Sequence, residues 1–373
     1  MNNEHRQLMK KLLFLLSLLL FMACSRGMQL KTYPANDQHV RIMGRHLVTQ
    51  NGAVKFGASG VTFYMTFRGT RLAVDLHDEF RDSTSYNWFD VKVDGSPVHE
   101  FRTRMGKTHY VLADSLKPGV HTLVFCKATE GQNGHNELVN IQTNKLLQAA
   151  SLPKRKIEYI GDSITCGFGD DTLHYACGKG HWFDHTNAWY AYGPRLARRL
   201  HTQWMLSSVS GIGMHRNWNN YSPVMPDVYN GVYMEYTKNP VPWNFSEYTP
   251  DLVVIALGTN DFSKGPGKKP RQKLDGNAFV KDYTKFVARV HKKYPSAKFM
   301  LANSPMFGHP KNKILEGYLQ RVIKNTKATG DSAIAQFDWQ KKYNHGCDGH
   351  PYMNQQAMME QQLLPKVRKY MGW

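Results

Sequence analysis

The spacing of apolar residues changes near Leu152-Pro153-Lys154, and this change constrains the fold more than any other feature of the chain. Before it, residues 38–150 consist of short alternating or β-branched runs separated by Gly and Pro turn signals, without a convincing helix. Strands of this length and spacing are typical of a β-sandwich or jelly roll. At 373 residues the chain is long enough for two domains. We therefore predict a β-sandwich domain over residues 38–150.

Residues 154–373 alternate between strand and helix patterns. The clearest strand is the continuous apolar run at 252–257, which is typical of a strand buried on both faces of a parallel sheet. Further strands are expected at 157–160, 204–209, 298–302 and 333–337, and helices at 188–200, 278–294, 315–329 and 355–370. This alternation predicts a three-layer α/β/α domain with helices on both faces of the sheet.

The N-terminus is typical of an export signal. A basic segment (residues 6–11) precedes an apolar run at 12–22 that is too short to span a bilayer as a stable helix. The alanine and Cys24 that follow resemble the lipobox of bacterial lipoproteins, in which the cysteine is lipidated. We predict a signal peptide over residues 1–23, lipidation at Cys24 and a tether over residues 24–37. An ordinary secretory signal with an incidental cysteine is the alternative.

These features predict an exported protein anchored to a membrane by lipid, on the periplasmic side or at the cell surface of a Gram-negative outer membrane. Cleavage after residue 23 would remove three basic residues and one acidic residue, and would lower the formal charge from +19 to +17. The basic residues are scattered rather than clustered, which favours a solvated basic surface. We therefore expect no nucleic-acid partner.

Four cysteines follow Cys24, and some of them are expected to pair in an oxidising compartment. They are Cys126, Cys166, Cys177 and Cys347. A bridge between Cys166 and Cys177 would close a short loop and stabilise the fold by about 2–4 kcal/mol. Two free buried thiols are the alternative.

A serine follows the first strand of the second domain, in the tetrad 161–164 (Gly-Asp-Ser-Ile). A strand that breaks at a glycine and then presents Ser163 lifts a hydroxyl above the carboxyl edge of a parallel sheet, where ligands of such folds bind. Further loops that carry Gly211, Asn260, and Asp348 with His350 follow other strands or precede the last helix. The topology would bring these loops to one edge of the sheet.

Together these residue types are what acyl transfer requires. A serine is a poor nucleophile until a histidine takes its proton, and the histidine needs an acceptor on its other ring nitrogen. We predict Ser163 as nucleophile, His350 as base and Asp348 as the orienting acid. The amides of Ser163 and Gly211 and the side chain of Asn260 would stabilise the oxyanion.

At these residues the chain resembles the SGNH (GDSL) hydrolases, which carry a serine, glycine, asparagine and histidine in four ordered blocks. The blocks here begin at Gly161, Gly211, Gly258 and Gly346. With a β-rich domain ahead of them, the chain is similar to carbohydrate esterase family 2, the acetyl xylan esterase-like proteins. The resemblance implies a jelly roll packed on a flavodoxin-like SGNH domain, without metal or cofactor. It also implies removal of O-acetyl groups from plant polysaccharides such as xylan and glucomannan through an acetyl-serine.

The chain departs from the SGNH pattern beside the histidine. Asp348 stands two residues before His350, whereas most SGNH hydrolases have three-residue spacing. Family 2 uses the shorter spacing, and in some members a main-chain carbonyl orients the histidine. The carbonyl of Gly349 is therefore the alternative to the Asp348 carboxylate. Gly349 also occupies a position at which family members often carry a tryptophan that would stack on sugar.

Other polar and aromatic residues are candidates for structural or binding roles near the site. Asp162 and Asp261 are expected to accept backbone amides and hold their loops. His309 copies the local His-Pro pattern of His350 and is a possible substrate-loop residue. Trp218 and Trp243 lie in loop-like stretches and are predicted to bind sugar. No Cys-x-x-Cys or His-Glu-x-x-His pair is present, so we predict no catalytic metal.

The sequence thus favours an exported serine esterase that deacetylates plant cell-wall polysaccharide or oligosaccharide. A peptidoglycan O-acetyl esterase or a lipase-like SGNH esterase is the alternative within the same reaction class. A non-catalytic glycan-binding lipoprotein with a vestigial second domain is the alternative from a different class.

Overall fold

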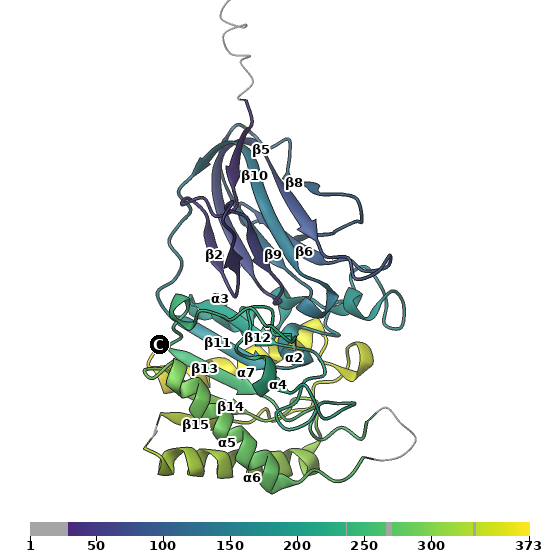
Figure 1. Cartoon of the computed structure of the whole chain (residues 1–373), viewed down its shortest axis with the longest axis vertical. Coiled ribbons are helices and arrows are strands. Elements are labelled where there is room, and N and C mark those ends of the chain that lie inside the picture. The colour runs from purple at the N-terminus through teal and green to yellow at the C-terminus, as the bar shows by residue number, and fades with distance from the viewer. Residues whose placement is uncertain (1–28, 236, 266–270, 331–332) are drawn as a thin grey trace, which may run out of the picture.

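The computed structural model describes residues 29–235, 237–265, 271–330 and 333–373, which form two domains, one above the other in Figure 1. The predicted signal peptide and Cys24 lie outside the described residues. None of the helices in the described ranges combines the length and the apolar character needed to cross a bilayer.

The first domain is a curled antiparallel sheet that encloses its own core, with ten strands among the described residues. The strands are β1 (Lys31–Pro34), β2 (Arg41–Met43), β3 (Leu47–Val48), β4 (Val54–Phe56), β5 (Thr62–Asp78), β6 (Trp88–Val93), β7 (His99–Arg102), β8 (His109–Ala113), β9 (Gly119–Lys127) and β10 (Asn136–Leu147). The long strand β5 lies between β10 and β9. Buried aromatic rings fill the core, with Phe89 and Phe125 stacked at 4.8 Å. The predicted β-sandwich is confirmed.

The tether predicted for residues 24–37 is wrong in its second half. Strand β1 pairs with β10, from Lys31 opposite Thr143 to Pro34 opposite Asn140, and Ala35 is fully buried. The side chains of β1 are mostly exposed, so the strand carries no apolar alternation that sequence reasoning could detect. Main-chain hydrogen bonds to β10 hold it instead.

The second domain is a parallel sheet between two layers of helices. The strands are β11 (Lys156–Gly161), β12 (Gln203–Ser208), β13 (Leu252–Ala256), β14 (Lys298–Ala302) and β15 (Ile334–Phe337), in the order β12-β11-β13-β14-β15. The helices are α2 (Ser163–Cys166), α3 (Tyr192–Leu200), α4 (Met225–Val228), α5 (Gly276–Lys293), α6 (His309–Ala328) and α7 (Met353–Met371). Helices α5 and α6 pack on one face of the sheet, and α3 and α7 pack on the other. The predicted three-layer, flavodoxin-like arrangement is confirmed.

Alternate residues of one strand supply the two cores of this domain. In β13, Val253 and Ile255 pack with α5 and α6, whereas Leu252 and Val254 pack with α3 and α7. This two-sided burial explains why the strand is a continuous apolar run. Helix α5 is capped by Asp275, whose carboxylate accepts the amides of two first-turn residues.

Two helices differ from their predicted bounds. Helix α6 begins at His309 instead of residue 315, because Pro310 fits the first turn of a helix, where no amide donor is needed. His309 is exposed at this helix start and does not line the cavity described below, so its role in a substrate loop stays a prediction. The helix predicted over 188–200 is a 3-10 turn (Ala188–Tyr190) followed by α3, because Ala191 is extended.

A buried arginine joins the two domains. Arg45, from the loop between β2 and β3, is fully buried and pairs with Glu158 of β11 at 3.2 Å. Its guanidinium also donates to Ser207 and to the carbonyls of Tyr229 and Gly231, at 2.6–3.2 Å. A buried charge this fully paired fixes the position of one domain on the other, since losing one partner of such a pair typically costs about 3–5 kcal/mol.

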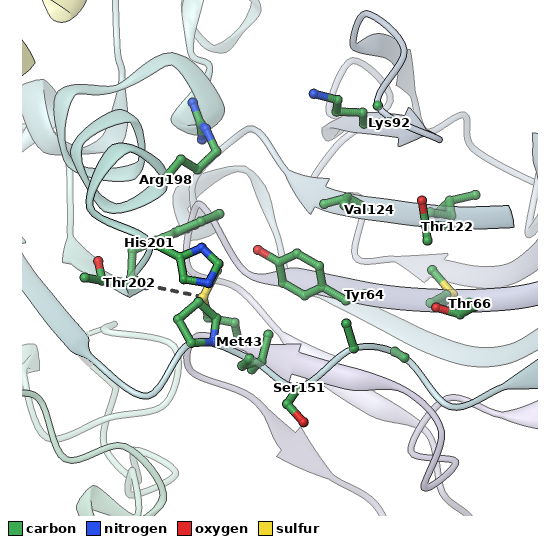
Figure 2. Close-up of a pocket in the computed structure, with 18 of the residues that line it drawn as sticks. Met43, Tyr64, Thr66, Lys92, Thr122, Val124, Ser151, Arg198, His201 and Thr202 are labelled. Atoms are coloured by element: carbon green, nitrogen blue, oxygen red, sulfur yellow. Dashed lines mark hydrogen bonds between the residues drawn. The ribbon is translucent and has the colours of Figure 1, made fainter.

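A cavity of about 430 Å³ lies at this interface, away from the sheet edge that carries the predicted catalytic residues. Its walls come from both domains, including Tyr64 and Val124 of the first and Arg198 and His201 of the second (Figure 2). None of the residues predicted to act in the site lines this cavity.

Candidate active site

Ser163 and His350 are in hydrogen-bond contact. Ser163 opens the short helix α2 directly after β11, and its Oγ lies 2.8 Å from Nε2 of His350. The turn is tight: a Cβ atom on Gly161 would lie 2.0 Å from the hydroxyl of Thr165, so a side chain is excluded there. Asp162 caps α2 by accepting the Ile164 amide at 3.1 Å. The fold thus brings the predicted nucleophile and base together across 187 residues of sequence.

The main-chain carbonyl of Asp348 orients His350, and the prediction that the Asp348 carboxylate does so is wrong. Nδ1 of His350 lies 3.2 Å from this carbonyl, whereas the carboxylate is exposed and forms no ion pair with the ring. Asp348 has a left-handed backbone conformation (φ 52°), which turns its carbonyl toward the imidazole. The alternative, the Gly349 carbonyl, is also wrong. Because a carbonyl only accepts, Nδ1 carries the proton and Nε2 can take the Ser163 proton.

Burial keeps His350 in its basic form. Desolvation lowers the pKa of His350 to about 4, although hydrogen bonding to the Asp348 carbonyl opposes the shift. The ring packs edge-on against Phe168, with centroids 4.6 Å apart. A Cβ atom on Gly169 would lie 2.6 Å from the His350 Cβ, so the close packing of this loop requires glycine. At neutral pH the histidine is therefore an unprotonated base.

The predicted oxyanion donors line the same cavity as the serine. This cavity has a volume of about 720 Å³ and includes Ser163, Gly211, Asn260 and His350 in its wall. Within the described ranges, the amides of Ser163 and Gly211 donate to no protein acceptor. Asn260 Nδ2 already donates to the Ile212 carbonyl at 2.8 Å and to Asp162 at 3.2 Å. The two amides are thus available to an oxyanion, and the third donor, Asn260, stays a prediction.

The two aspartates beside the catalytic motifs hold loops. Asp261 is fully buried and accepts the amides of Met214, His215 and Arg216 at 2.7–3.0 Å. Desolvation raises its pKa and also raises the pKa of Asp162 to about 7. Asp261 therefore shapes the loop that follows Gly211.

The first domain also positions this loop, through contacts that no sequence pattern indicates. Both carboxylate oxygens of Glu130 accept hydrogen bonds from Ser210, one from its amide at 2.7 Å and one from its hydroxyl at 2.5 Å. Gln132 donates to the Ser210 carbonyl at 2.8 Å and lines the cavity. Ser210 precedes Gly211, so the β domain holds the backbone that presents the Gly211 amide.

Exposed tryptophans form part of the cavity wall. Trp218 is 43% exposed and Trp182 is 40% exposed, and both line the cavity. Trp218 also lies against Gly211, where a Cβ atom would come within 2.4 Å of its ring. Trp182 is not among the residues predicted to bind sugar, although it lies in an aromatic-rich segment between two motifs.

Trp243 does not bind in this cavity, and its prediction as a sugar-binding residue is wrong. Only 5% of Trp243 is exposed, and it packs with Met205, Val232 and Tyr248 in a core cluster beneath β12. Its loop-like sequence context gave the wrong indication, because the segment folds back onto the domain.

The disulfide joins Cys177 to Cys347, so the Cys166–Cys177 bridge is wrong. The two Cα atoms lie 5.0 Å apart although 170 residues separate them in sequence. Cys166 is buried in α2, with its thiol 3.2 Å from the hydroxyl of Ser208. The bridge therefore ties the segment after Ser163 to the turn that carries His350. Elsewhere, the described residues contain no group of three or more His, Cys, Asp or Glu side chains arranged to hold a metal ion.

Comparisons with known proteins agree with this arrangement. The family description "Carbohydrate esterase 2 N-terminal" matches residues 42–153, and "GDSL-like Lipase/Acylhydrolase family" matches residues 159–357. An acetylxylan esterase / glucomannan deacetylase from Cellvibrio japonicus is 30% identical over 345 residues, which cover 89% of this chain and 91% of that protein. The chain belongs to carbohydrate esterase family 2.

Solved structures of family 2 carbohydrate esterases have the same two-domain fold. One from Cellvibrio japonicus is 26% identical, with a TM-score of 0.83 over 92% of this chain and 99% of that one. Another, from Clostridium thermocellum in complex with cellohexaose, is 28% identical, with a TM-score of 0.79 over 90% and 99% of the two chains.

As a family 2 carbohydrate esterase, the protein is a carboxylic ester hydrolase, and its geometry accounts for each proton. The contact allows Ser163 Oγ to bond to the ester carbonyl carbon as its proton passes to Nε2 of His350, with the negative oxygen placed toward the two amides. His350 could then return the proton to the departing alcohol oxygen. A water molecule that gives its proton to His350 and attacks the acyl-serine would release the acid and restore both groups.

Proposed function

We propose that this esterase removes O-acetyl groups from plant cell-wall polysaccharide or oligosaccharide, such as xylan or glucomannan, through an acetyl-Ser163 intermediate. The observation that carries the proposal is the Ser163–His350 contact inside a cavity walled by exposed tryptophans. An indole face stacks on a sugar ring, whereas the hydroxyl attacks an ester that the ring carries. The relatives named as acetylxylan esterases and glucomannan deacetylases support this substrate class.

The test is acetate release from acetylated xylan and acetylated glucomannan, followed by NMR, with Ser163→Ala as the matched control. We expect release by the wild type and a loss of at least 10³-fold in the variant, because removing the nucleophile leaves only binding and oxyanion stabilisation. Release that persists in Ser163→Ala would disprove the acetyl-serine route.

The alternative functions give different results in the same assay. A peptidoglycan O-acetyl esterase would prefer acetylated peptidoglycan, and a lipase-like enzyme would prefer esters of long acyl chains. A non-catalytic glycan-binding protein would bind the polysaccharides without releasing acetate. The paired Ser163 and His350 favour catalysis over the last of these.

We also propose that the protein is exported and anchored by lipid at Cys24. The basic and apolar N-terminal segments and the small residue before Cys24 support the proposal. Metabolic labelling with a fatty acid should mark the wild type and leave Cys24→Ala unlabelled and released from membranes. Equal membrane retention of both proteins would contradict the anchor.

A further inference from the structure

Lys311 is a cation in the wall of the active-site cavity without a protein counter-ion. It lies on the first turn of α6, and its Nζ sits 4.3 Å from the centroid of the Phe307 ring. Within the described ranges no carboxylate lies within ion-pair distance of it. Asp348 is the acidic residue of the cavity wall, and it forms no ion pair with Lys311.

The position of Lys311 is unfavourable for a positive charge. Helix N-termini carry partial positive charge, so a cation in the first turn of α6 is repelled. Desolvation lowers the pKa of Lys311, and the nearby Lys264 lowers it further. The ring of Phe307 compensates only in part, since a solvent-accessible cation–π contact is a weak attraction.

Lys313, two residues along the same helix, provides the contrast. Its ammonium group pairs with Glu316 at 3.6 Å, and its side chain is 64% exposed. It does not line the cavity. Of these two lysines, the exposed Lys313 is paired and Lys311, in the cavity wall, is not.

We propose that Lys311 binds the carboxylate of a uronic acid on the substrate, which makes the enzyme selective for acetylated polysaccharides that carry acidic sugars. This inference rests on the proposed deacetylation and narrows its substrate class. A sugar ring stacked on Trp182 or Trp218 places its neighbours along the cavity, where an anionic substituent can meet Lys311, the one lysine among the described residues that line it. Xylan with glucuronate side groups fits this chemistry, and neutral glucomannan lacks the anion.

The test uses a matched pair of substrates. One is a glucuronate-bearing xylan, and the other is the same xylan after its uronate carboxyls have been reduced to alcohols. Both are then acetylated chemically to the same degree. We expect wild-type kcat/KM to be about fivefold higher on the uronate-bearing xylan at low salt, the size of a single solvent-accessible ion pair. The preference should shrink as salt is added.

The variant Lys311→Met keeps the length of the side chain and removes its charge, and Lys313→Met is the control. We expect Lys311→Met to lose the preference and its salt dependence, with a larger fall in kcat/KM on the uronate-bearing xylan than on the reduced xylan. Lys313→Met should behave as the wild type. Equal loss by Lys311→Met on both xylans and on a small acetyl ester would overturn the proposal, because Lys311 would then act on the reacting centre or the fold.

The two proposals fail in different ways. Absence of Ser163-dependent acetate release from every substrate would reject the proposed function. Ser163-dependent release at the same rate from both xylans would leave that function intact and reject uronate recognition by Lys311.

Discussion

The carbonyl oxygen of Asp348 accepts a hydrogen bond from Nδ1 of His350 at 3.2 Å, while the carboxylate of the same residue is exposed. The base of this esterase is therefore oriented by a dipole of the main chain. Such a dipole fixes the tautomer as a carboxylate would, whereas the Asp348 carboxylate acts on the ring only through its charge, which raises the pKa of His350 less than burial lowers it.

The substitution Asp348→Asn should consequently be mild. Asparagine tolerates the left-handed backbone at this position, and the orienting carbonyl remains. We expect kcat to stay within about threefold of the wild type, whereas the corresponding change in a carboxylate-based triad costs about 10⁴-fold. Steady-state kinetics on a soluble acetyl ester measure this. A loss beyond 100-fold in a folded Asp348→Asn protein would show that the carboxylate orients the base.

The acid limb of the pH–rate profile should lie unusually low. His350 acts as a base only when it is unprotonated, and burial lowers its pKa to about 4. Activity is therefore lost as pH falls through about 4, rather than through the ordinary value of about 6.5. In Phe168→Ala, water reaches the ring, so the midpoint should rise toward 6.5. Activity regained on return to pH 7 would separate titration from unfolding, and a wild-type midpoint near 6.5 would contradict the prediction.

Glu130 should affect the rate more than binding. Alanine at this position removes both acceptors, so both hydrogen bonds to Ser210 are lost and the Gly211 amide is less firmly placed. We expect kcat of Glu130→Ala to fall about tenfold, or about 1.4 kcal/mol, with KM within twofold. Glu137→Ala, on strand β10 and outside the cavity wall, is the control. A rise in KM at constant kcat would point to substrate binding by the first domain instead.

Replacing Trp218 by alanine should affect substrate binding, whereas replacing Trp243 by alanine should affect stability. Trp218→Ala removes a cavity wall, so KM for acetylated oligosaccharide should rise about tenfold while the melting temperature changes little. Trp243→Ala empties a core position and should cost about 3–5 kcal/mol of stability without a change in KM at low temperature. Kinetics and denaturant unfolding of both variants distinguish these outcomes. A KM effect from Trp243→Ala in a folded protein would return that residue to the site.

Local sequence patterns predicted those strands and loops whose structure depends on neighbouring residues in the chain. The apolar run of β13 and the loops with Ser163 and His350 follow from strand periodicity and the carboxyl-edge rule for parallel sheets. The role of the Asp348 carbonyl depends on a backbone angle, and the role of Glu130 on contact between domains, so neither leaves a local signal. Strand β1 was missed because its edge position leaves its side chains exposed.

The Cys177–Cys347 bridge should support the turn that carries His350. It closes a loop of 170 residues, and cross-links of long loops stabilise by about 2–5 kcal/mol. The double variant Cys177→Ser/Cys347→Ser should melt at a lower temperature than the wild type and lose activity on heating before the bulk of the fold unfolds, since His350 stands three residues after Cys347.

Adding a thiol reductant should lower the melting temperature of the wild type to that of the variant and leave the variant unchanged. Cys126→Ala removes a buried free thiol and is the control, because it should retain the response to reductant. Free-thiol titration should show that the reductant has opened the bridge. If the melting temperature of the wild type is then unchanged, packing around Gly169, rather than the covalent link, holds the His350 turn.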